Sequence, residues 1–494
     1  MPGHKTRCKR SGQGLPDMAC GWRRQWHRGN SMWDRYATLD FVTGIAQQID
    51  ISQLINVLYV NKRLLERYDI AIIGGGILGT CISYWISSLF DTNLCLLEKE
   101  PDVAMHASGR NTGVVHSPFY IHPGTRKVLT KASVLSHNMW EHLAKSRSVP
   151  WKKTGVLELA LDEKQHGKLE KYMKWGERNG IPPNSLNLLD AQQVSDIEPN
   201  IRCHSAIHCG CEVSTDFGHL TKTLRHMSAN NGTNFLLGTN VTDINRKGCQ
   251  ISLKDGPDIC ADFVINCAGG NSLDVARMFG LAMQYSDLHF RGEYWVADSG
   301  HKDLVGSTVY TVAEFEKYPF LDPHWIKRAD GRTEVGPNAV PVPSPETYSG
   351  YLGDVATSVA KLGEILTGNA LKLFYDPEFL SLISREWLSS ISKTAMIDRV
   401  RRFIPHIKPE FFPSRGTAGI RSPVITPEGK FLPDVMEIED ECSFHIVNYN
   451  SPGATGAPAY SAFVVNRLYE AGFLGSMGSP KDVMWDFADT INQY

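Results

Sequence analysis

The chain has no excess of either charge and no low-complexity sequence. Its 51 Lys and Arg residues are matched by 53 Asp and Glu residues, which gives a net charge of -2. This balance argues against a chain-wide basic surface for nucleic acid and against an acidic tail. With 42% hydrophobic and 21% charged residues, the composition excludes collagen-like, mucin-like and largely disordered proteins. The 494 residues are enough for two or three domains.

Apolar segments suited to spanning a membrane are also missing. Residues 70–90 and 442–466 contain no Asp, Glu, Lys or Arg and are long enough for a span. The first stretch has four glycines within residues 74–79, and the second is interrupted by His, Asn, Gly and Pro. A strand, a glycine turn and a buried helix explain the first stretch, and the second is too polar. We therefore predict no transmembrane helix.

Cysteine is present, but in no pattern that indicates disulfides or zinc. The eleven cysteines are an odd number scattered along the chain, which predicts free thiols in a reducing compartment. One dense group has a spacing unlike the paired zinc-ligand patterns, so we predict no metal there. It comprises Cys203, His204, His208, Cys209 and Cys211. A Walker loop and a Ser, His and Asp order are missing too, which gives no support to kinase or hydrolase assignments.

The first 67 residues form a basic extension that differs from the rest of the chain. Up to Arg35 it has eight Lys or Arg residues against two Asp residues, and it lacks the apolar core of a secretory signal. A transit peptide, a disordered tail and sequence upstream of a true start at Met32 all fit this composition. Residues 38–66 then show apolar residues at helical spacing, which predicts a helix leading into the first domain.

A dinucleotide-binding pattern follows this extension. Residues 70–73 are an apolar run typical of a buried parallel strand, and residues 82–90 and 93–97 predict a helix and a second strand. Between them stands a Gly-x-Gly-x-x-Gly motif, which comprises Gly74, Gly76, Ile77, Leu78 and Gly79. Its glycines permit a tight turn, the approach of a pyrophosphate and close packing of helix on strand. Glu98 ends the second strand, where a carboxylate accepts the ribose hydroxyls of an adenosine, and Lys99 follows it.

The loop after the ribose-binding acid distinguishes between NAD and FAD. Residues 106–117 are rich in hydroxyl, amide and glycine residues. A flavin nucleotide needs such a loop for its ribityl hydroxyls and pyrophosphate, whereas a nicotinamide dehydrogenase has no such need at this position. We therefore predict FAD, and the loop residues expected to contact it are Ser108, Asn111, Thr112 and Gly113.

These residues resemble the D-amino-acid-oxidase-like superfamily of FAD enzymes, and most of all its L-2-hydroxyglutarate dehydrogenase family. The resemblance extends from residue 68 to the C-terminal helix. It is carried by residues 111–117, Tyr120, 123–124, 290–294, 318–321, His324, 330–331, 336–340, 415–416, 418–421, Asp434 and 450–455. Residues 341–346 and 422–423 depart from the family pattern near the expected substrate side, which leaves the exact substrate open.

The resemblance implies an α/β fold with two domains interleaved along the chain. A Rossmann-like FAD-binding domain, a βαβ unit with the glycine motif, is expected from residues 68–155, 210–285 and 405–494. A substrate domain with a mixed or antiparallel sheet is expected from residues 156–209 and 286–404. Further FAD contacts are expected near the adenine, at a strand end and at a helix N-terminus, where the helix dipole stabilises negative charge on the reduced ring. These residues are Val241, Ala268, Gly269, Gly453, Ala454 and Thr455.

Oxidation of an alcohol beside a carboxylate requires a base, a hydride acceptor and a cation. Arginine is the better carboxylate anchor because its planar fork binds both oxygens. The candidates are Arg421, at a position where the superfamily has a carboxylate-binding arginine, and Arg291. Each could instead form a salt bridge between domains. The candidate bases are His116, from the FAD loop, and His324, from the substrate domain.

The resemblance therefore predicts an FAD-dependent dehydrogenase that oxidises a small 2-hydroxy acid, with L-2-hydroxyglutarate converted to 2-oxoglutarate by hydride transfer to the flavin. The alternatives are a glycine- or sarcosine-type oxidase, a glycerol-3-phosphate dehydrogenase, and a flavin-binding partner subunit without a redox role. A quinone or an electron-transfer protein is the expected electron acceptor, with peripheral membrane contact and no nucleic-acid partner. We expect an intracellular protein, cytoplasmic or on the inner face of an energy-transducing membrane, which is mitochondrial in a eukaryote.

Overall fold

The computed structural model describes residues 65–493 except 246–249, 255, 316 and 321. The predicted basic extension, up to residue 64, and nearly all of the predicted helix over residues 38–66 lie outside the described residues. At the boundary, Glu66 already belongs to strand β1 (Glu66–Ile73) and pairs with Ile259. The helix prediction is therefore wrong at Glu66, because a sheet partner far along the chain determines its conformation.

A parallel sheet around β1 confirms the predicted Rossmann-like unit. In spatial order its parallel strands are β24 (Ser443–Val447), β12 (Ile259–Asn266), β1, β2 (Leu94–Glu98) and β9 (Asn234–Leu237). The antiparallel strands that complete it are β10 (Val241–Asn245), β11 (Gln250–Leu253) and β23 (Met436–Asp440). Ile70 and Ile72 face one hydrophobic core, whereas Ala71 and Ile73 face another. This burial on both faces explains why residues 70–73 of β1 are apolar without alternation.

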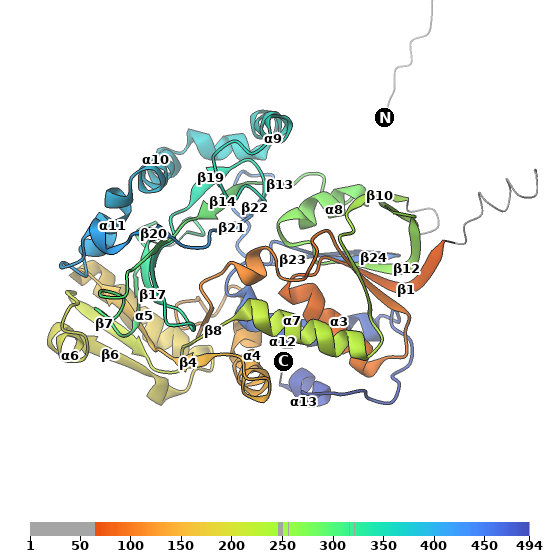
Figure 1. The fold of residues 1–494 in the computed structure, drawn as a ribbon, viewed down its shortest axis with the longest axis horizontal. Helices are drawn as coiled ribbons and strands as arrows, with labels where there is room; N and C mark the ends of the chain where they lie inside the picture. The colour runs from red at the N-terminus through yellow and green to blue at the C-terminus, as the bar shows by residue number, and fades with distance from the viewer. Residues whose placement is uncertain (1–64, 246–249, 255, 316, 321, 494) are drawn as a thin grey trace, which may run out of the picture. The chain divides into compact units, whose positions relative to one another are not determined.

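Helices cover both faces of this sheet (Figure 1). Every residue of α3 (Ile77–Leu89) is buried, which accounts for its lack of charged side chains. The helices of the same layer are α4 (Lys127–Ser146), α7 (Phe217–Asn230), α12 (Gly453–Glu470) and α13 (Phe487–Asn492). On the opposite face, Val275 of α8 (Ser272–Met278) packs with Ala71 and Ile73.

The second large sheet is mixed and mainly antiparallel, in agreement with the predicted fold class. In spatial order its strands are β20 (Ser414–Arg415), β15 (Trp295–Val296), β18 (Thr333–Gly336), β17 (His324–Lys327), β16 (Thr308–Thr311), β5 (Val156–Ala160), β7 (Ser205–Cys209) and β6 (Leu186–Asp190). Strands β16 and β5 run parallel. Helix α5 (Glu163–Arg178) packs on one face, and α6 (Ala191–Ile197) and α11 (Lys393–Arg401) contribute to the core on the other.

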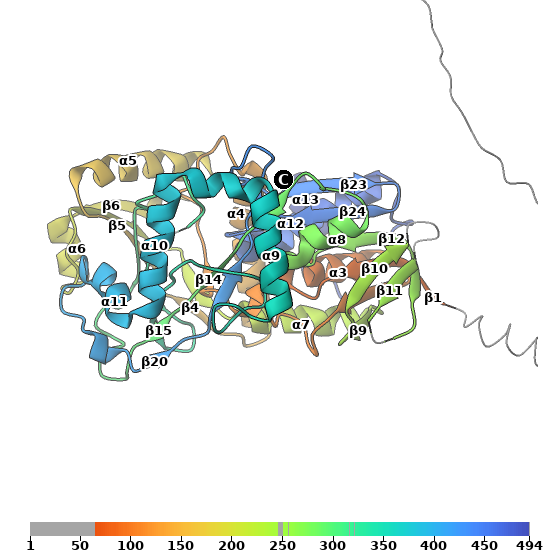
Figure 2. The same ribbon diagram turned by 90° about the horizontal axis from the view of Figure 1, so that it is seen from above.

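Three small sheets carry several of the candidate site residues. Their strands are β3 (Val114–Val115), β8 (Val213–Thr215) and β4 (Trp151–Lys153); β19 (Val340–Val342), β14 (His289–Gly292) and β21 (Gly419–Arg421); and β13 (Ser286–Asp287) with β22 (Val424–Ile425). Helices α9 (Val355–Thr367) and α10 (Pro377–Ile391) lie at the upper edge in Figure 1 and in front in Figure 2. Both large sheets take strands from separated parts of the chain, and the exact domain boundaries stay a prediction.

Two features are absent from the described residues. None of their helices has the length and apolar character needed to cross a bilayer. Nor do these residues contain a group of three or more His, Cys, Asp or Glu side chains arranged to hold a metal ion.

Candidate active site

The glycine turn between β1 and α3 has two structural glycines and one that faces a cavity. Gly74 has a φ of +109°, and a Cβ atom there would lie 2.4 Å from the Cys267 carbonyl oxygen. A Cβ atom on Gly79 would lie 2.1 Å from the Gly74 carbonyl oxygen. At Gly76 the nearest atom would be Ser108 Oγ at 3.2 Å. The first two glycines therefore allow strand and helix to pack, whereas Gly76 keeps the path of a ligand open.

A cavity of about 430 Å³ begins at this turn. The predicted cofactor residues that line it are Gly74, Gly76, Glu98, Lys99, Ser108, Val241, Ala268 and Gly269. Glu98 is buried, and its two oxygens accept hydrogen bonds from Gly75 N at 2.7 Å and Glu100 N at 2.9 Å. An ionised carboxylate has about four acceptor positions, so Glu98 can also accept the hydroxyls of a ribose.

A second cavity, of about 300 Å³, adjoins the first. Both are lined by Gly76, Ser108, Gly269 and Arg421, so together they form a continuous cleft. The other predicted cofactor residues along the second part are Ile77, Leu78, Asn111, Thr112, Gly453, Ala454 and Thr455. Helices α3 and α12 both begin at this cleft, and their N-terminal dipoles favour the negative charge of a pyrophosphate or a reduced flavin.

Two predicted cofactor residues lie outside the lining of both cavities. Gly79 supports the turn, as described above. Gly113 has a φ of +77°, and a Cβ atom there would lie 2.5 Å from the Thr215 carbonyl oxygen. Gly113 is therefore explained by the close approach of β8, and the structure does not bring it to the cleft. The remaining residues fit FAD, because glycines, hydroxyls and a carboxylate follow one another along the cleft.

His116, His324 and Arg421 line the second cavity together with Tyr310. His116 follows β3, His324 begins β17, Tyr310 lies in β16 and Arg421 ends β21. The Tyr310 ring lies 4.2 Å from that of His324 and 6.1 Å from that of His116, measured between centroids. The fold thus brings together three of the four predicted catalytic residues, which are up to 305 positions apart in the sequence.

The two histidines differ in their surroundings. His324 is buried, and burial lowers its pKa to about 3, so its ring is neutral at physiological pH. Among the described residues, none forms a hydrogen bond with His324 Nδ1. His116 is partly exposed to the cavity, and its Nδ1 lies 3.5 Å from Glu212 Oε2. His116 therefore has a carboxylate beside it that can balance a positive charge.

Arg421 also faces the cavity without an acidic partner. One of its Nη atoms donates to the Pro319 carbonyl oxygen, and no carboxylate among the described residues forms an ion pair with it. Burial and, to a smaller extent, the charge of Arg126 lower its pKa. Such a cation favours an anionic ligand in the adjacent space.

Arg291, the other predicted carboxylate anchor, is placed elsewhere. It is 2% exposed, and its Nη2 atom donates to Glu293 Oε1 at 2.9 Å. Its Nη1 atom donates to the Thr347 carbonyl oxygen at 3.0 Å. Arg291 is not part of the lining of either cavity described above. Its strand, β14, pairs with β21, which carries Arg421, but the Arg291 side chain has internal partners and does not line the cleft.

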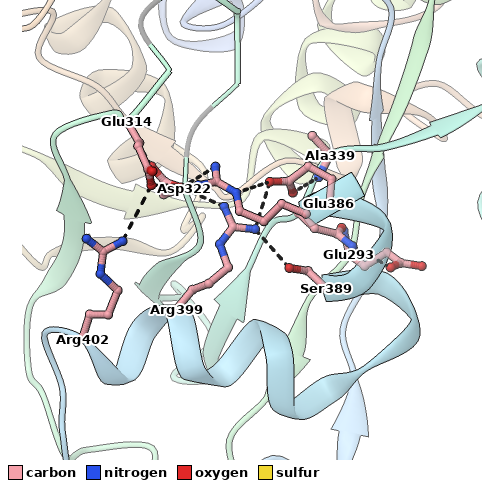
Figure 3. A network of polar contacts seen from close by, with 10 residues as sticks. Glu293, Glu314, Asp322, Ala339, Glu386, Ser389, Arg399 and Arg402 are labelled. Atoms are coloured by element: carbon pink, nitrogen blue, oxygen red, sulfur yellow. Dashed lines mark hydrogen bonds and ion pairs between the residues drawn. The ribbon is translucent and has the colours of Figure 1, made fainter. Parts of the chain in front are cut away.

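A network of charged residues holds two cavity-lining segments in place (Figure 3). Arg399 of α11 contacts Asp322 at 2.7 Å and Glu386 of α10 at 2.9 Å. Glu386 Oε2 accepts a hydrogen bond from Ala339 N at 2.8 Å. Because Asp322 precedes His324 by two residues and Ala339 lines the second cavity, the network fixes this wall of the site.

Sequence reasoning missed one residue of the cavity lining, Tyr310, and two buried carboxyl groups beside it, Glu158 and Glu212. Glu158 in β5 lies beside Tyr310 in β16, because the two are register partners in neighbouring strands. Glu212 lies directly before β8 and is completely buried. The sequence offers one weak signal, which is that Glu158 interrupts an otherwise apolar strand.

A Rossmann-like sheet whose glycine turn opens onto such a cleft defines a dinucleotide-binding protein, and the site beside it defines an oxidoreductase. The sequence matches the family described as FAD dependent oxidoreductase, DAO, over residues 69–467. The chain belongs to this family and is an FAD-dependent oxidoreductase, which confirms the predicted superfamily and cofactor.

Comparisons with individual proteins agree with this assignment. The chain is 28% identical to the mitochondrial L-2-hydroxyglutarate dehydrogenase of Caenorhabditis elegans over 82% of this chain and 93% of that protein. It is 25% identical to the L-2-hydroxyglutarate dehydrogenase of Escherichia coli strain K12 over 84% and 95%. Its fold is similar to that of the FAD-bound L-alpha-glycerophosphate oxidase of Mycoplasma pneumoniae, with a TM-score of 0.66, 19% identity and coverage of 85% of this chain and 98% of that chain. For glycine oxidase of Geobacillus kaustophilus the TM-score is 0.61, with 17% identity and coverage of 86% and 98%.

Proposed function

We propose that this protein oxidises L-2-hydroxyglutarate to 2-oxoglutarate. The observation that carries the proposal is Arg421, a cation that faces the same cavity as two histidines and has no acidic partner among the described residues. The relatives named above are L-2-hydroxyglutarate dehydrogenases, and this chain matches them over most of their length. FAD, when bound, would supply the acceptor for the hydride from C2 of the substrate.

The residues of the cavity would share the remaining work. Arg421 binds the carboxylate next to the reacting carbon through its guanidinium fork. His116 takes the proton of the 2-hydroxyl group, because Glu212 can balance the charge that the ring gains. His324 stays neutral and offers a hydrogen bond, since burial keeps its pKa at about 3. Glu98 and the turn at Gly76 hold the adenosine and pyrophosphate.

Replacement of Arg421 tests this assignment. Arg421→Lys keeps a positive charge but loses the fork, so the substrate binds less tightly and C2 is misoriented. We expect a higher KM, slower anaerobic flavin reduction and a loss of about ten- to a hundredfold in kcat/KM. Arg332→Lys, at a half-exposed position with an Asp330 partner, serves as the matched control. Flavin reduction at the wild-type rate in Arg421→Lys would contradict the proposed role.

A panel of substrates under anaerobic conditions separates the alternative functions. Bleaching of the flavin by L-2-hydroxyglutarate, but not by glycine, sarcosine or glycerol 3-phosphate, supports the proposal. Bleaching by glycine or sarcosine supports an amino-acid oxidase, and bleaching by glycerol 3-phosphate supports a glycerol-3-phosphate dehydrogenase. The solved structures named above are enzymes of these kinds with a similar fold. A flavin that no compound reduces supports a flavin-binding partner subunit.

We further propose that a quinone or an electron-transfer protein receives the electrons and that the protein contacts a membrane peripherally, in a mitochondrion if the source is eukaryotic. The animal relatives include proteins named mitochondrial. The surface that supports membrane contact is the outer side of α9, which exposes aliphatic residues along its length. They are Val355, Val359, Leu362 and Leu366, each more than half exposed.

A further inference from the structure

Glu212 is a buried carboxylate that the overall reaction does not explain. It has no exposed surface, and its Oε1 atom accepts a hydrogen bond from Ser117 N at 2.9 Å. Its Oε2 atom lies 3.5 Å from His116 Nδ1. Neither Oε2 nor Nδ1 has a hydrogen-bond partner among the described residues. Since burial of an unpaired carboxylate is costly, the two atoms are best explained as partners.

The strands hold this pair in a fixed position. Strands β3 and β8 pair antiparallel, with Val115 opposite Val213, so His116 and Glu212 meet at the same end of the ladder. The His116 backbone N–H donates to Thr455 Oγ1 at 3.1 Å, which ties it to the first turn of α12. The histidine is therefore anchored both to the small sheet and to the helix that begins at the cleft.

Several of the other groups near His116 and Glu212 are neutral. Burial, and then the charge of Glu212, raise the pKa of Glu158 to about 8, so Glu158 carries a proton at neutral pH. Burial likewise raises the pKa of Tyr310 and of Tyr120, which keeps both phenols neutral. The titratable and charged groups around His116 are Tyr120, Glu212, Tyr310, His324 and Arg421, and Glu158 and Cys211 lie close to Glu212.

We infer that Glu212 is the positioning residue of His116: it directs Nδ1 into the protein, leaves Nε2 for the cavity, and stabilises the imidazolium that forms during the reaction. The inference rests on the proposed function. As the substrate C–H bond breaks, its electron pair leaves as hydride to the flavin. The hydroxyl proton passes to His116 Nε2, and the oxygen forms the new carbonyl bond. The positive charge gained by the ring is balanced by Glu212.

Glu212→Gln tests the inference, because it retains an acceptor for Ser117 N and nearly the same volume but removes the charge. We expect kcat to fall about ten- to a hundredfold, with KM and flavin content close to wild type. The acid limb of the kcat profile moves to lower pH, because the carboxylate no longer favours protonation of the ring. Glu212→Asp keeps the charge and restores part of kcat.

The matched control is Glu198→Gln. Glu198 is a buried carboxylate that also accepts a backbone hydrogen bond, from Ser307 N at 2.8 Å, but unlike Glu212 it pairs with no histidine among the described residues. We expect a normal kcat and an unmoved acid limb in this variant. If Glu212→Gln keeps the wild-type kcat and acid limb, or if Glu212→Asp is no better than Glu212→Gln, the inference is wrong.

A measurement without substrate separates this inference from the proposed function. Histidine NMR of the holoenzyme, with the His116 signal assigned from His116→Asn, follows protonation of the ring directly. The inference requires that His116 in Glu212→Gln becomes protonated only at lower pH than in wild type. An unchanged titration overturns the inference even if L-2-hydroxyglutarate is the substrate. A shifted titration in an enzyme that no 2-hydroxy acid reduces supports the pair and overturns the proposed substrate.

Discussion

Glu158 is a buried carboxyl group with no ion-pair partner among the described residues. Because its pKa is raised to about 8, the folded protein keeps its proton at pH values where the unfolded chain has lost it. The stability associated with this group is therefore present below the ordinary pKa of Glu and is lost as the pH rises toward 8. We expect Glu158→Gln to melt above the wild-type temperature at pH 8, by the equivalent of up to roughly 4 kcal/mol, and close to it near pH 4.5.

Thermal melts of both proteins across this pH range measure the difference. Glu177→Gln, on the exposed side of α5, is the matched control and should follow the wild-type pH dependence. A Glu158→Gln variant that differs from wild type by the same amount at pH 4.5 and pH 8 would show that Glu158 does not titrate in this window.

Single residues could be predicted from the sequence where they belong to a motif. His116 and Arg421 were found through the family resemblance, and Glu98 through its distance from the glycine turn. Glu212 and Tyr310 belong to no motif, because their roles arise only when β3 meets β8 and when β16 joins β5. Arg291 also belongs to a motif, but the sequence pattern did not reveal that its side chain binds Glu293 inside the protein. Its predicted role as a carboxylate anchor is therefore not supported by its position.

Within the β1–α3 turn, two glycines should respond differently to the same small change. Gly76→Ala adds a methyl group 3.2 Å from Ser108 Oγ, which a small movement accommodates, but the group projects into the ligand path. Gly79→Ala adds it 2.1 Å from a backbone oxygen, so strand and helix must separate. We expect Gly76→Ala to fold with a reduced flavin content and Gly79→Ala to be destabilised even without flavin.

Flavin absorbance and melting temperature of the apoproteins separate these two effects. Gly167→Ala in α5, where an added Cβ atom would meet nothing within 4 Å, is the control and should keep both wild-type values. A Gly79→Ala apoprotein as stable as wild type would contradict the packing role. A Gly76→Ala protein with full flavin content would contradict its role in the cleft.

Individual strands and helices could be predicted from the sequence more readily than the pairing of the strands. The apolar runs and the glycine motif predicted β1, α3 and β2, since burial on both faces leaves a clear pattern. The addition of β24 beside β12 joins residues almost 180 positions apart, and no local pattern indicates it. The small sheet of β19, β14 and β21, which brings Arg421 to the cleft, depends in the same way on distant partners.

On the scale of the whole molecule, the outer side of α9 is unusual for a protein surface. Lys361 is the buried residue of this helix, where it pairs with Asp287 and Glu364. Val355 and Val359 are 77% and 64% exposed. The Lys361–Asp287 pair and the pair between Glu364 and Arg277 of α8 hold the polar side of the helix to the protein, and the aliphatic side faces outward. An amphipathic helix oriented in this way can enter the interfacial region of a bilayer.

If α9 binds the bilayer, replacement of its aliphatic residues should weaken membrane binding. Each buried Val or Leu side chain is worth roughly 1.5–3 kcal/mol, so we expect Val359→Asp or Leu362→Asp to reduce sedimentation with phosphatidylcholine vesicles at least about tenfold, with flavin content unchanged. Ile197→Asp, also half exposed but in α6, is the control and should bind like wild type.

Binding through α9 persists in high salt, whereas binding through the basic residues before Arg35 is removed by salt. The role of α9 would be contradicted if salt removes the protein from the vesicles and Leu362→Asp does not change its binding. It would also be contradicted if the wild-type protein is a dimer in solution and Leu362→Asp dissociates that dimer.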